Sequence, residues 1–172
     1  MINKNRKPQK IWGKEFISEA KKRGYILKKP TQEEFNEFVN FILVGKGKSG
    51  PVSVRISLKS RKKTNRSNKK PNDNWAWVEL RTVNGEFGWL YGGSDLVVFE
   101  LEDKYIFVNR KRLLQYVNSN IDFDLPFVQN SWEAKYKIYQ REGKLDQITQ
   151  VKMSNILDLE NVYQWEKSNE ES

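Results

Sequence analysis

The chain has 172 residues, 13% of them aromatic, and carries 31 lysines and arginines against 22 acidic residues, a formal net charge of +9. This length and aromatic content predict one folded domain, and the basic surplus favours polyanionic partners, nucleic acid first. The chain contains no cysteine and no histidine, which excludes disulfides, thiolate nucleophiles, histidine general bases and the usual zinc sites.

The N-terminal part is predicted to contain a helix and a capped turn. Trp12 begins an apolar stripe with a spacing of four that continues to Ala20, and Gly24 is a suitable stop for this helix. Further along, Thr31 precedes Glu34 by three positions, as in a capping box. Glu34 therefore has an ordinary structural explanation beside any functional one.

Two adjacent strands come next. Residues 38–44 form an apolar run interrupted by Asn40, which predicts a buried strand. The glycine-rich residues 45–51 predict a turn. In residues 52–58, valine, isoleucine and leucine alternate with serine and arginine, which predicts a strand with one buried face. Lys59 closes the polar face of that strand.

A dense basic segment follows this strand. Its cations are Arg61, Lys62, Lys63, Arg66, Lys69 and Lys70. Such a segment favours salt-dependent contact with a phosphate backbone, and the alternative is a solvated, mobile loop. Residues 75–83 then predict a strand in which Trp75 and Trp77 share one face. We expect these indoles in the core or on a packing shelf, with a base-stacking platform as the alternative.

The middle of the chain predicts further strands and a helix. Residues 87–91 are expected to be extended, and residues 96–99 and 105–108 to be core strands. Asn109 is a suitable N-cap for a helix that follows. The first turn of that helix contains Arg110, Lys111 and Arg112. Three cations in that turn oppose the helix dipole, so we assign them to nucleic-acid binding.

The C-terminal part predicts a hairpin with arms near 132–140 and 145–152, followed by a short helix. With residues 1–10 as a flexible basic arm and 167–172 as a solvated tail, residues 11–166 are expected to form a single domain. The order of helices and strands predicts an α/β (mixed α+β) fold, with a central mixed β-sheet flanked by helices.

Three stretches together resemble parts of a known fold. They are T-Q-E-E-F-N-E-F-V-N-F at 31–41, V-R-I-S-L-K-S-R-K-K at 54–63, and W-V-E-L-R-T-V-N-G-E-F-G-W-L-Y-G-G-S-D-L-V-V-F-E at 77–100. The set resembles the PD-(D/E)XK, or restriction-endonuclease-like, fold in a form met among phage and prokaryotic nuclease-like proteins. The resemblance covers about residues 31–165 and implies a restriction-endonuclease-like core with a C-terminal hairpin. In such folds acids hold Mg²⁺, and a lysine positions the attacking water or steadies charge on the phosphate.

Position by position, the resemblance implies a site that has lost charge. Glu34 matches the acid on the N-terminal helix or turn, while Asn40 stands where the second acid belongs. In the acid-x-Lys pair, Ser57 stands at the acid and Lys59 at the lysine. Neutral asparagine and serine bind a hard cation far more weakly than carboxylates do. The resemblance therefore implies a catalytic site in which neutral residues replace two of the metal-binding acids.

Three carboxylates on or beside neighbouring strands, Glu79, Asp95 and Glu100, are candidates to replace the missing acids. Glu79 joins the catalytic set, and Glu34, Glu79 and Asp95 form the candidate metal-binding set. Glu79, which alternates with apolar residues, has an ordinary alternative as a half-exposed salt-bridge partner. Asp95, after Gly-Gly-Ser, has an alternative as a loop-shaping cap.

Three functions are compatible with these residues. The first is a nucleic-acid-binding, nuclease-like protein with a degraded or altered metal site. The second is an active Mg²⁺-dependent DNA endonuclease that uses relocated carboxylates, with Mg²⁺ as its cofactor. The third is a virus-encoded interaction module or inhibitor without a nucleic-acid role. We favour the first, with DNA rather than RNA as partner, and leave open a homodimer or a protein partner.

No apolar run approaches the roughly 18 residues of a membrane span, so no membrane partner is predicted. The first ten residues lack the apolar segment of a secretory signal. We therefore expect a cytoplasmic protein, located in an infected host cell if the phage-like resemblance holds.

Overall fold

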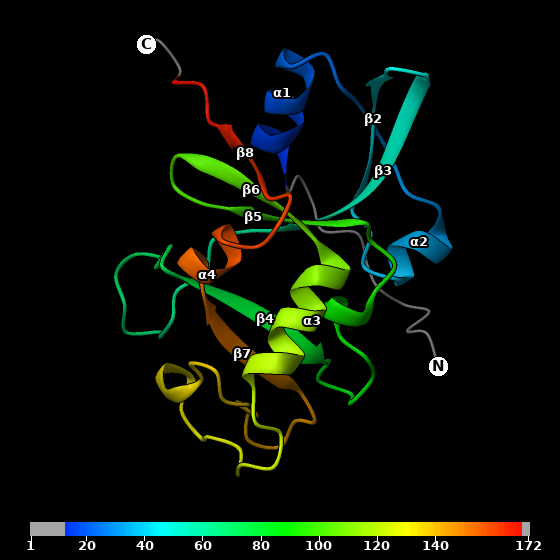
Figure 1. Ribbon diagram of the computed structural model, residues 1–172. Helices are drawn as coiled ribbons and strands as arrows, with labels where there is room; N and C mark the ends of the chain where they lie inside the picture. The colour runs from blue at the N-terminus through cyan, green and yellow to red at the C-terminus, as the bar shows by residue number, and fades with distance from the viewer. Residues whose placement is uncertain (1–12, 170–172) are drawn as a thin grey trace.

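Two β-sheets of unequal size organise the protein, and its computed structural model describes residues 13–169 (Figure 1). Over that range the helices and strands are α1 Lys14–Lys22, β1 Ile26–Lys28, α2 Gln32–Asn36, β2 Phe41–Gly47, β3 Gly50–Lys59, β4 Trp75–Arg81, η1 Trp89–Tyr91, β5 Leu96–Glu100, β6 Lys104–Asn109, α3 Arg110–Asn120, η2 Ser131–Glu133, β7 Gln147–Lys152, α4 Met153–Leu157 and β8 Tyr163–Glu166. The predicted arm at 1–10 and the first apolar residue of the helix stripe, Trp12, lie outside the described residues.

Within residues 13–169, six strands form the large sheet in the order β1-β2-β3-β5-β6-β8, and β4 pairs with β7 in a second sheet. β3 and β5 run parallel, and the other neighbouring strands run antiparallel. The predicted mixed α/β fold, with a central mixed sheet flanked by helices, is confirmed. No helix in this part of the chain is long and apolar enough to cross a membrane.

The large sheet is covered on both faces, because alternate side chains of its strands point to different apolar clusters. On one face, Phe16 and Ala20 of α1 pack on Ile56 and Leu58 of β3, and all four are buried. On the other face, α3, α4 and the second sheet share a core with β5 and β6, in which Leu113 is completely buried. The helix stripe predicted to end near Ala20 is thus confirmed over its described part.

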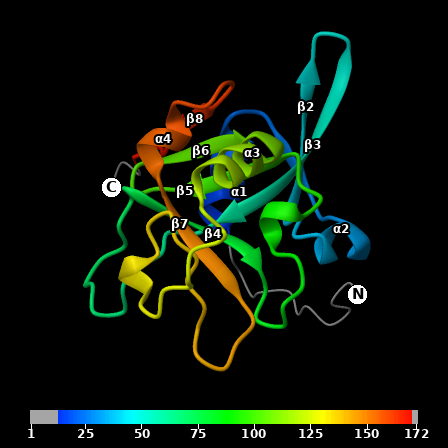
Figure 2. The ribbon, with the colours of Figure 1, turned by 60° about the horizontal axis from the view of Figure 1, so that its bottom comes forward.

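β3 passes from an exposed hairpin into the covered part of the sheet. Its first half pairs with β2 in a hairpin that projects from the body of the molecule (Figures 1 and 2) and closes between Gly47 and Gly50. Its second half is buried on both faces, so that Ser57, predicted on the polar face, is 0% exposed. By strand alternation Ser57 points toward the core shared with the second sheet, and a period of two therefore does not mark exposure here.

The chain before β2 differs from the prediction. Residues 38–40 were expected in the strand, but β2 begins at Phe41. Phe38 adopts a left-handed conformation with φ of 67°, and its N–H donates to the carbonyl of Phe35 at 3.1 Å. A left-handed residue just past a helix is a common way to end it, so these residues close α2 instead of extending β2. The change of chain direction after α2 places Asn40 beside β3.

Two further segments are not the strands that were predicted. Residues 87–91 were expected to be extended, but η1 forms a single 3-10 turn there, flanked by Gly88 and Gly92. Of the predicted hairpin, the second arm forms as β7 and pairs with β4. The first arm, 132–140, contributes an antiparallel bridge between Tyr139 and Ile148, and it includes part of η2.

The described end of the predicted tail is bound to the domain. The Lys167 ammonium contacts Glu100 at 3.1 Å, and the Ser168 N–H and hydroxyl donate to Glu19 at 2.9 and 3.1 Å. Glu19 on α1 is 2% exposed. Burial, the largest single influence, would raise the pKa of Glu19, but hydrogen bonds from Arg23 and Ser168 outweigh it and lower that pKa to about 2. This carboxylate therefore ties α1 to the C-terminal segment.

Candidate functional site

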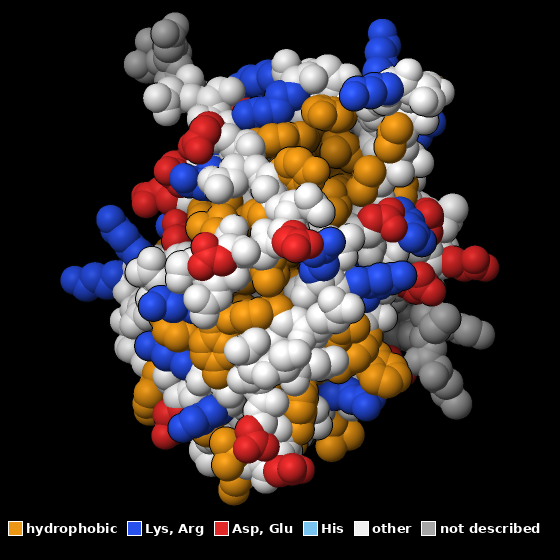
Figure 3. Space-filling view, in the orientation of Figure 1, with side chains coloured by type: hydrophobic (Ala, Val, Ile, Leu, Met, Phe, Trp, Pro, Cys, Tyr) orange, Lys and Arg blue, Asp and Glu red, His pale blue; other side chains and the backbone are white. Residues whose placement is uncertain are grey.

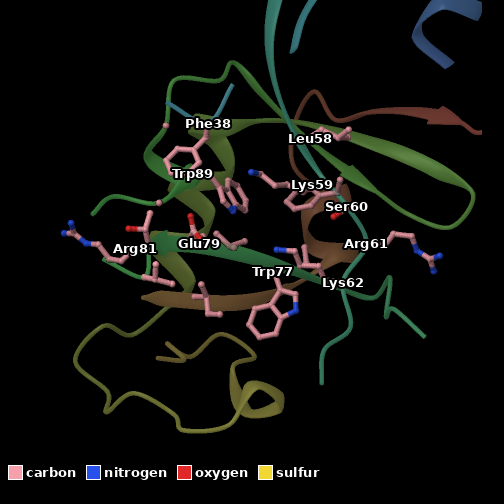
Figure 4. A pocket seen from close by; sticks show the side chains of 18 of the residues that line it. Phe38, Leu58, Lys59, Ser60, Arg61, Lys62, Trp77, Glu79, Arg81 and Trp89 are labelled. Atoms are coloured by element: carbon pink, nitrogen blue, oxygen red, sulfur yellow. The ribbon is translucent and has the colours of Figure 1, made fainter. Parts of the chain in front are cut away.

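A groove of about 2050 Å³ opens between the second sheet, the end of β3 and the segment around α2 (Figure 4). Its floor includes one face of β4, formed by the side chains of Trp75, Trp77, Glu79 and Arg81. The opposite face of β4 consists of alanine, valine and leucine side chains that are buried in the core. Of the two expected placements, the core is therefore wrong for both indoles, whereas a packing shelf is compatible with their positions. They are half-buried and line the groove.

Lys59 lies at the end of β3, at the wall of this groove. Its ammonium nitrogen is 4.5 Å from the centre of the Trp89 ring, within cation–π range. Trp89 itself is 7% exposed and packs edge-on against Phe99, so its ring is a fixed support and not a mobile contact. Figure 4 shows the side chains of Lys59 and Glu79 directed toward the same part of the groove. The structure thus brings together the predicted lysine and one predicted carboxylate.

Gly88 allows the chain to pass close to Glu79. Its N–H donates to the carbonyl of Leu80 at 2.8 Å. A Cβ at Gly88 would lie 2.5 Å from the backbone oxygen of Glu79 and 2.8 Å from its Cγ. The backbone angles of Gly88 are ordinary, so close packing and not conformation requires glycine here.

Asn40 also lines the groove, and it has a structural role. Its side-chain oxygen accepts a hydrogen bond from the N–H of Leu58 at 2.8 Å, and its own N–H donates to the carbonyl of Ile56 at 2.7 Å. These bonds join the start of β2 to β3 next to Lys59. A carboxylate at position 40 could accept the same hydrogen bond from Leu58, so the neutral amide is not demanded by this contact.

Ser57 does not line the groove, although it shares a face of β3 with Lys59. Its hydroxyl is buried and has no hydrogen-bond partner among the described residues. A carboxylate at this position would be buried in the same way, and ionising it there would require a metal ion or another cation close by.

The other predicted carboxylates are held elsewhere. Glu34 forms the predicted capping box: its side chain accepts from the Thr31 N–H at 2.9 Å, and its own N–H donates to the Thr31 hydroxyl at 3.2 Å. Asp95 accepts from the Arg55 guanidinium at 2.8 and 3.1 Å and from the Arg55 N–H at 2.8 Å. Burial, the largest single influence, would raise the pKa of Asp95, but the bonds from Arg55 outweigh it and hold that pKa below its usual value.

Of the predicted catalytic and metal-binding residues, the groove therefore gathers Asn40, Lys59 and Glu79, whereas Glu34, Ser57 and Asp95 do not line it. Over residues 13–169, no group of three or more acidic side chains is arranged to hold a metal ion. Glu100, the further candidate, also lines the groove, but its carboxylate is paired with Lys167 at 3.1 Å. The gathered catalytic and metal-binding residues contribute one carboxylate, Glu79, and do not fit the oxygen-rich, carboxylate-based coordination of Mg²⁺ in phosphoryl-transfer sites.

The basic loop, residues 60–74, is anchored at two points. The Arg61 guanidinium donates to Asp73 at 2.8 and 3.2 Å, and Asp73 also accepts from the N–H of Glu102 at 2.8 Å. The indole N–H of Trp77 donates to the carbonyl of Lys63 at 3.1 Å. These contacts argue against a purely solvated, mobile loop. Of the predicted basic residues, Arg61, Lys62, Lys63 and Arg66 line the groove, and Lys69 and Lys70 do not.

The cations at the start of α3 do not line the groove, and the fold accounts for two of them. Arg110 donates to the carbonyls of Ser94 at 2.8 Å and Leu90 at 3.0 Å, which fixes the loop before β5. Arg112 pairs with Glu160, and Lys111 is exposed. On the face that carries α3, basic side chains lie scattered among acidic and hydrophobic ones (Figure 3).

Several groove residues were not singled out by sequence reasoning. Phe87 is 58% exposed and Trp132 is 54% exposed, and Arg81 lies over the Phe87 ring at 4.1 Å. Among the described residues the groove is lined by nine lysines or arginines and six acids. The available signal was weak: Trp132 stands alone in a polar stretch, and single aromatic residues in loops have many explanations.

No protein-family model, curated protein or solved structure matches the chain.

Proposed function

We propose that this protein binds nucleic acid in the groove, as a nuclease-like protein of the PD-(D/E)XK type whose metal site is altered. The observation that carries the proposal is the position of Lys59. It lies at the end of a core strand, in one groove with Asn40 and Glu79, directly before the anchored basic loop. This arrangement suits a phosphate group held by cations from the strand end and from the loop.

The charge of the groove supports a polyanionic ligand. Lys62, Lys63 and Arg66 are exposed residues that line the groove, and they contribute to its excess of cations over acids. Contacts of this kind hold the phosphate backbone without reading sequence, and they depend strongly on salt. We favour DNA over RNA as the ligand.

The placement of the carboxylates favours binding over hydrolysis. Glu34 is bonded within its capping box, and Asp95 is paired with Arg55, so neither joins Lys59 in the groove. An active Mg²⁺-dependent endonuclease with relocated acids needs several carboxylates near the scissile phosphate. Of the candidate carboxylates, Glu79 and Glu100 line the groove, and Glu100 is paired with Lys167 at 3.1 Å, so we favour binding with an altered metal site.

The test combines binding with cleavage. Labelled DNA should bind the folded protein at low salt, while supercoiled plasmid should stay intact with Mg²⁺ or Mn²⁺. Replacing Asn40 by Asp, alone and together with Ser57→Asp, should create metal-dependent nicking if the site descends from a nuclease. Thermal denaturation of each variant checks that it folds. Absence of DNA binding at low salt refutes the proposal. The altered metal site is refuted if the unmodified protein nicks the plasmid and Lys59→Ala abolishes that nicking.

An interaction module is the second candidate, and one observation favours it. The loop after α3 exposes apolar side chains within a few residues of one another: Phe123 is 45%, Leu125 48% and Phe127 36% exposed. Clustered apolar exposure is a feature of protein-binding surfaces. This candidate predicts a stoichiometric protein partner that survives nuclease treatment and is lost when Phe123 and Leu125 are both changed to Ser.

A further inference from the structure

We propose that the ligand of the groove is an unpaired nucleic-acid strand, whose bases stack on exposed aromatic side chains while its phosphates contact the basic loop. This inference rests on the proposed function and adds the class of substrate. The chemistry concerned is shared by single-stranded DNA and RNA, since both present unpaired bases on a phosphodiester backbone.

Large aromatic side chains are unusually exposed at the groove. Trp132 of η2 is 54% exposed, Phe87 after β4 is 58% exposed, and Tyr91 of η1 is 37% exposed. They come from different elements, yet all line the same basic groove. Aromatic rings beside cations form the surface on which single strands bind, because every base has a flat face that stacks irrespective of sequence.

Two of these rings belong to a cluster of groups in contact. The centres of the Phe87 and Tyr91 rings are 5.0 Å apart, and their planes are tilted by 46°. The Arg81 guanidinium lies 4.1 Å from the centre of the Phe87 ring, on the floor of the groove. These groups already hold one another in place. Stacking of a base on them would therefore lose little further side-chain conformational entropy.

A second aromatic pair joins the floor to the basic loop. The rings of Trp77 and Tyr139 lie 6.4 Å apart, and the Trp77 indole N–H donates to the carbonyl of Lys63. The same indole therefore forms part of the floor and fixes a basic loop residue, Lys63, that lines the groove. Base-stacking and phosphate-binding groups are thus held in a set relation to each other.

The length of the floor indicates the size of the ligand. From Trp75 to Arg81, β4 extends for about 20 Å at roughly 3.3 Å per residue. A stacked strand advances about 3.4 Å per nucleotide, so this floor accommodates about six nucleotides. A duplex presents only base edges in its grooves, because its base faces are covered by neighbouring pairs. The aromatic rings are therefore useful to an unpaired strand and not to a duplex.

The experiment measures fluorescence anisotropy of labelled DNA and RNA strands of about 12 nucleotides. These are compared with the corresponding DNA duplex and with a DNA strand that carries abasic sites over its central half. The abasic strand retains every phosphate, so it separates stacking from charge. Trp132→Ala is the test variant, Trp132→Phe is the conservative one, and Tyr163→Ala is the control, since Tyr163 is 61% exposed on β8 and does not line the groove.

We expect the intact strand to bind more tightly than both the duplex and the abasic strand. Trp132→Ala should weaken binding of the intact strand roughly 5- to 150-fold, the range for one stacked base. The abasic strand should be much less affected, Trp132→Phe should restore most of the affinity, and Tyr163→Ala should change nothing. Equal affinity for the intact and abasic strands, or a duplex that binds as tightly as the strand, overturns the inference while leaving the proposed function standing. Failure of every nucleic acid to bind at low salt overturns both.

Discussion

The basic loop offers a quantitative test of where the nucleic acid lies. Lys62, Lys63 and Arg66 are exposed and line the groove, so a bound backbone should contact all three. For a single strand, log K falls with log salt with a slope of about −0.7 per phosphate contact. Changing all three residues to Ala should therefore make the slope shallower by about 2.

That slope has a consequence at ordinary salt concentrations. Between about 50 and 200 mM salt, the unmodified protein should lose roughly 20-fold more affinity than the triple variant, because three contacts no longer release counterions. Anisotropy titrations of one labelled strand at four salt concentrations, on protein whose folding is verified by circular dichroism, measure both slopes.

A matched control separates local contact from overall charge. Lys69, Lys70 and Lys111 are exposed and do not line the groove, so their triple change to Ala removes the same charge elsewhere. This control should keep the slope of the unmodified protein to within a few tenths. The reasoning is refuted if the control shifts the slope as much as the groove variant, or if the groove variant keeps the original slope.

Three further predictions concern stability. Gly88→Ala should destabilise the protein by about 1–3 kcal/mol in urea denaturation, because its Cβ would meet the backbone of Glu79. Asn40→Ala should cost about 1–2 kcal/mol by leaving the Leu58 N–H without its partner, whereas Asn40→Asp should retain that hydrogen bond and most of the stability. Glu19 has a folded-state pKa of about 2, below its unfolded value, so its contribution is fully present above about pH 4.5 and disappears as the pH falls toward 2. Glu19→Gln should therefore lower stability at neutral pH by on the order of 2 kcal/mol and flatten the acid limb of the stability curve.

Each of these predictions has an outcome that contradicts it. Unchanged stability of Gly88→Ala would show that the chain can move away from Glu79 at no cost. An Asn40→Asp protein as unstable as Asn40→Ala would show that the amide group itself, and not an acceptor oxygen, is required. An acid unfolding curve for Glu19→Gln that matches the original would show that other carboxylates govern acid stability.

The alternation of residues predicted β4 well but did not decide whether its two indoles lie in the core or on a packing shelf. The alternation in Trp75–Arg81 predicted a strand with two distinct faces, and both tryptophans do share one. Hydrophobicity alone favoured the core or a packing shelf for them. However, that face also carries Glu79 and Arg81, and the small aliphatic residues of the other face pack without any polar group to satisfy. The charged residues that follow the indoles on the same face, Glu79 and Arg81, were the better indicator of the groove.

Local signals succeeded where a single hydrogen-bond pattern decides the structure. The capping box of Thr31 and Glu34 and the N-cap of Asn109, whose side chain accepts from the Arg112 N–H at 3.1 Å, formed as predicted. Long-range partners could not be read in this way. The ion pair between Arg55 and Asp95 joins residues far apart in the chain, and a candidate metal ligand cannot be told from a salt-bridge partner until the sheet is assembled.

The pairing of β4 with β7 determines when the groove can form. About 70 residues separate the paired positions Val78 and Thr149, so this contact closes one of the long loops of the fold and is expected to form slowly. During synthesis β4 leaves the ribosome well before its partner strand, with its edge unpaired and its two indoles exposed. A chain interrupted before Gln147 would retain the residues around Lys59 and β4 itself but lack β7, the strand that pairs with β4 and holds the floor of the groove in place. Such fragments should be prone to aggregate. Premature termination late in the chain should therefore impair ligand binding as much as loss of the residues around Lys59.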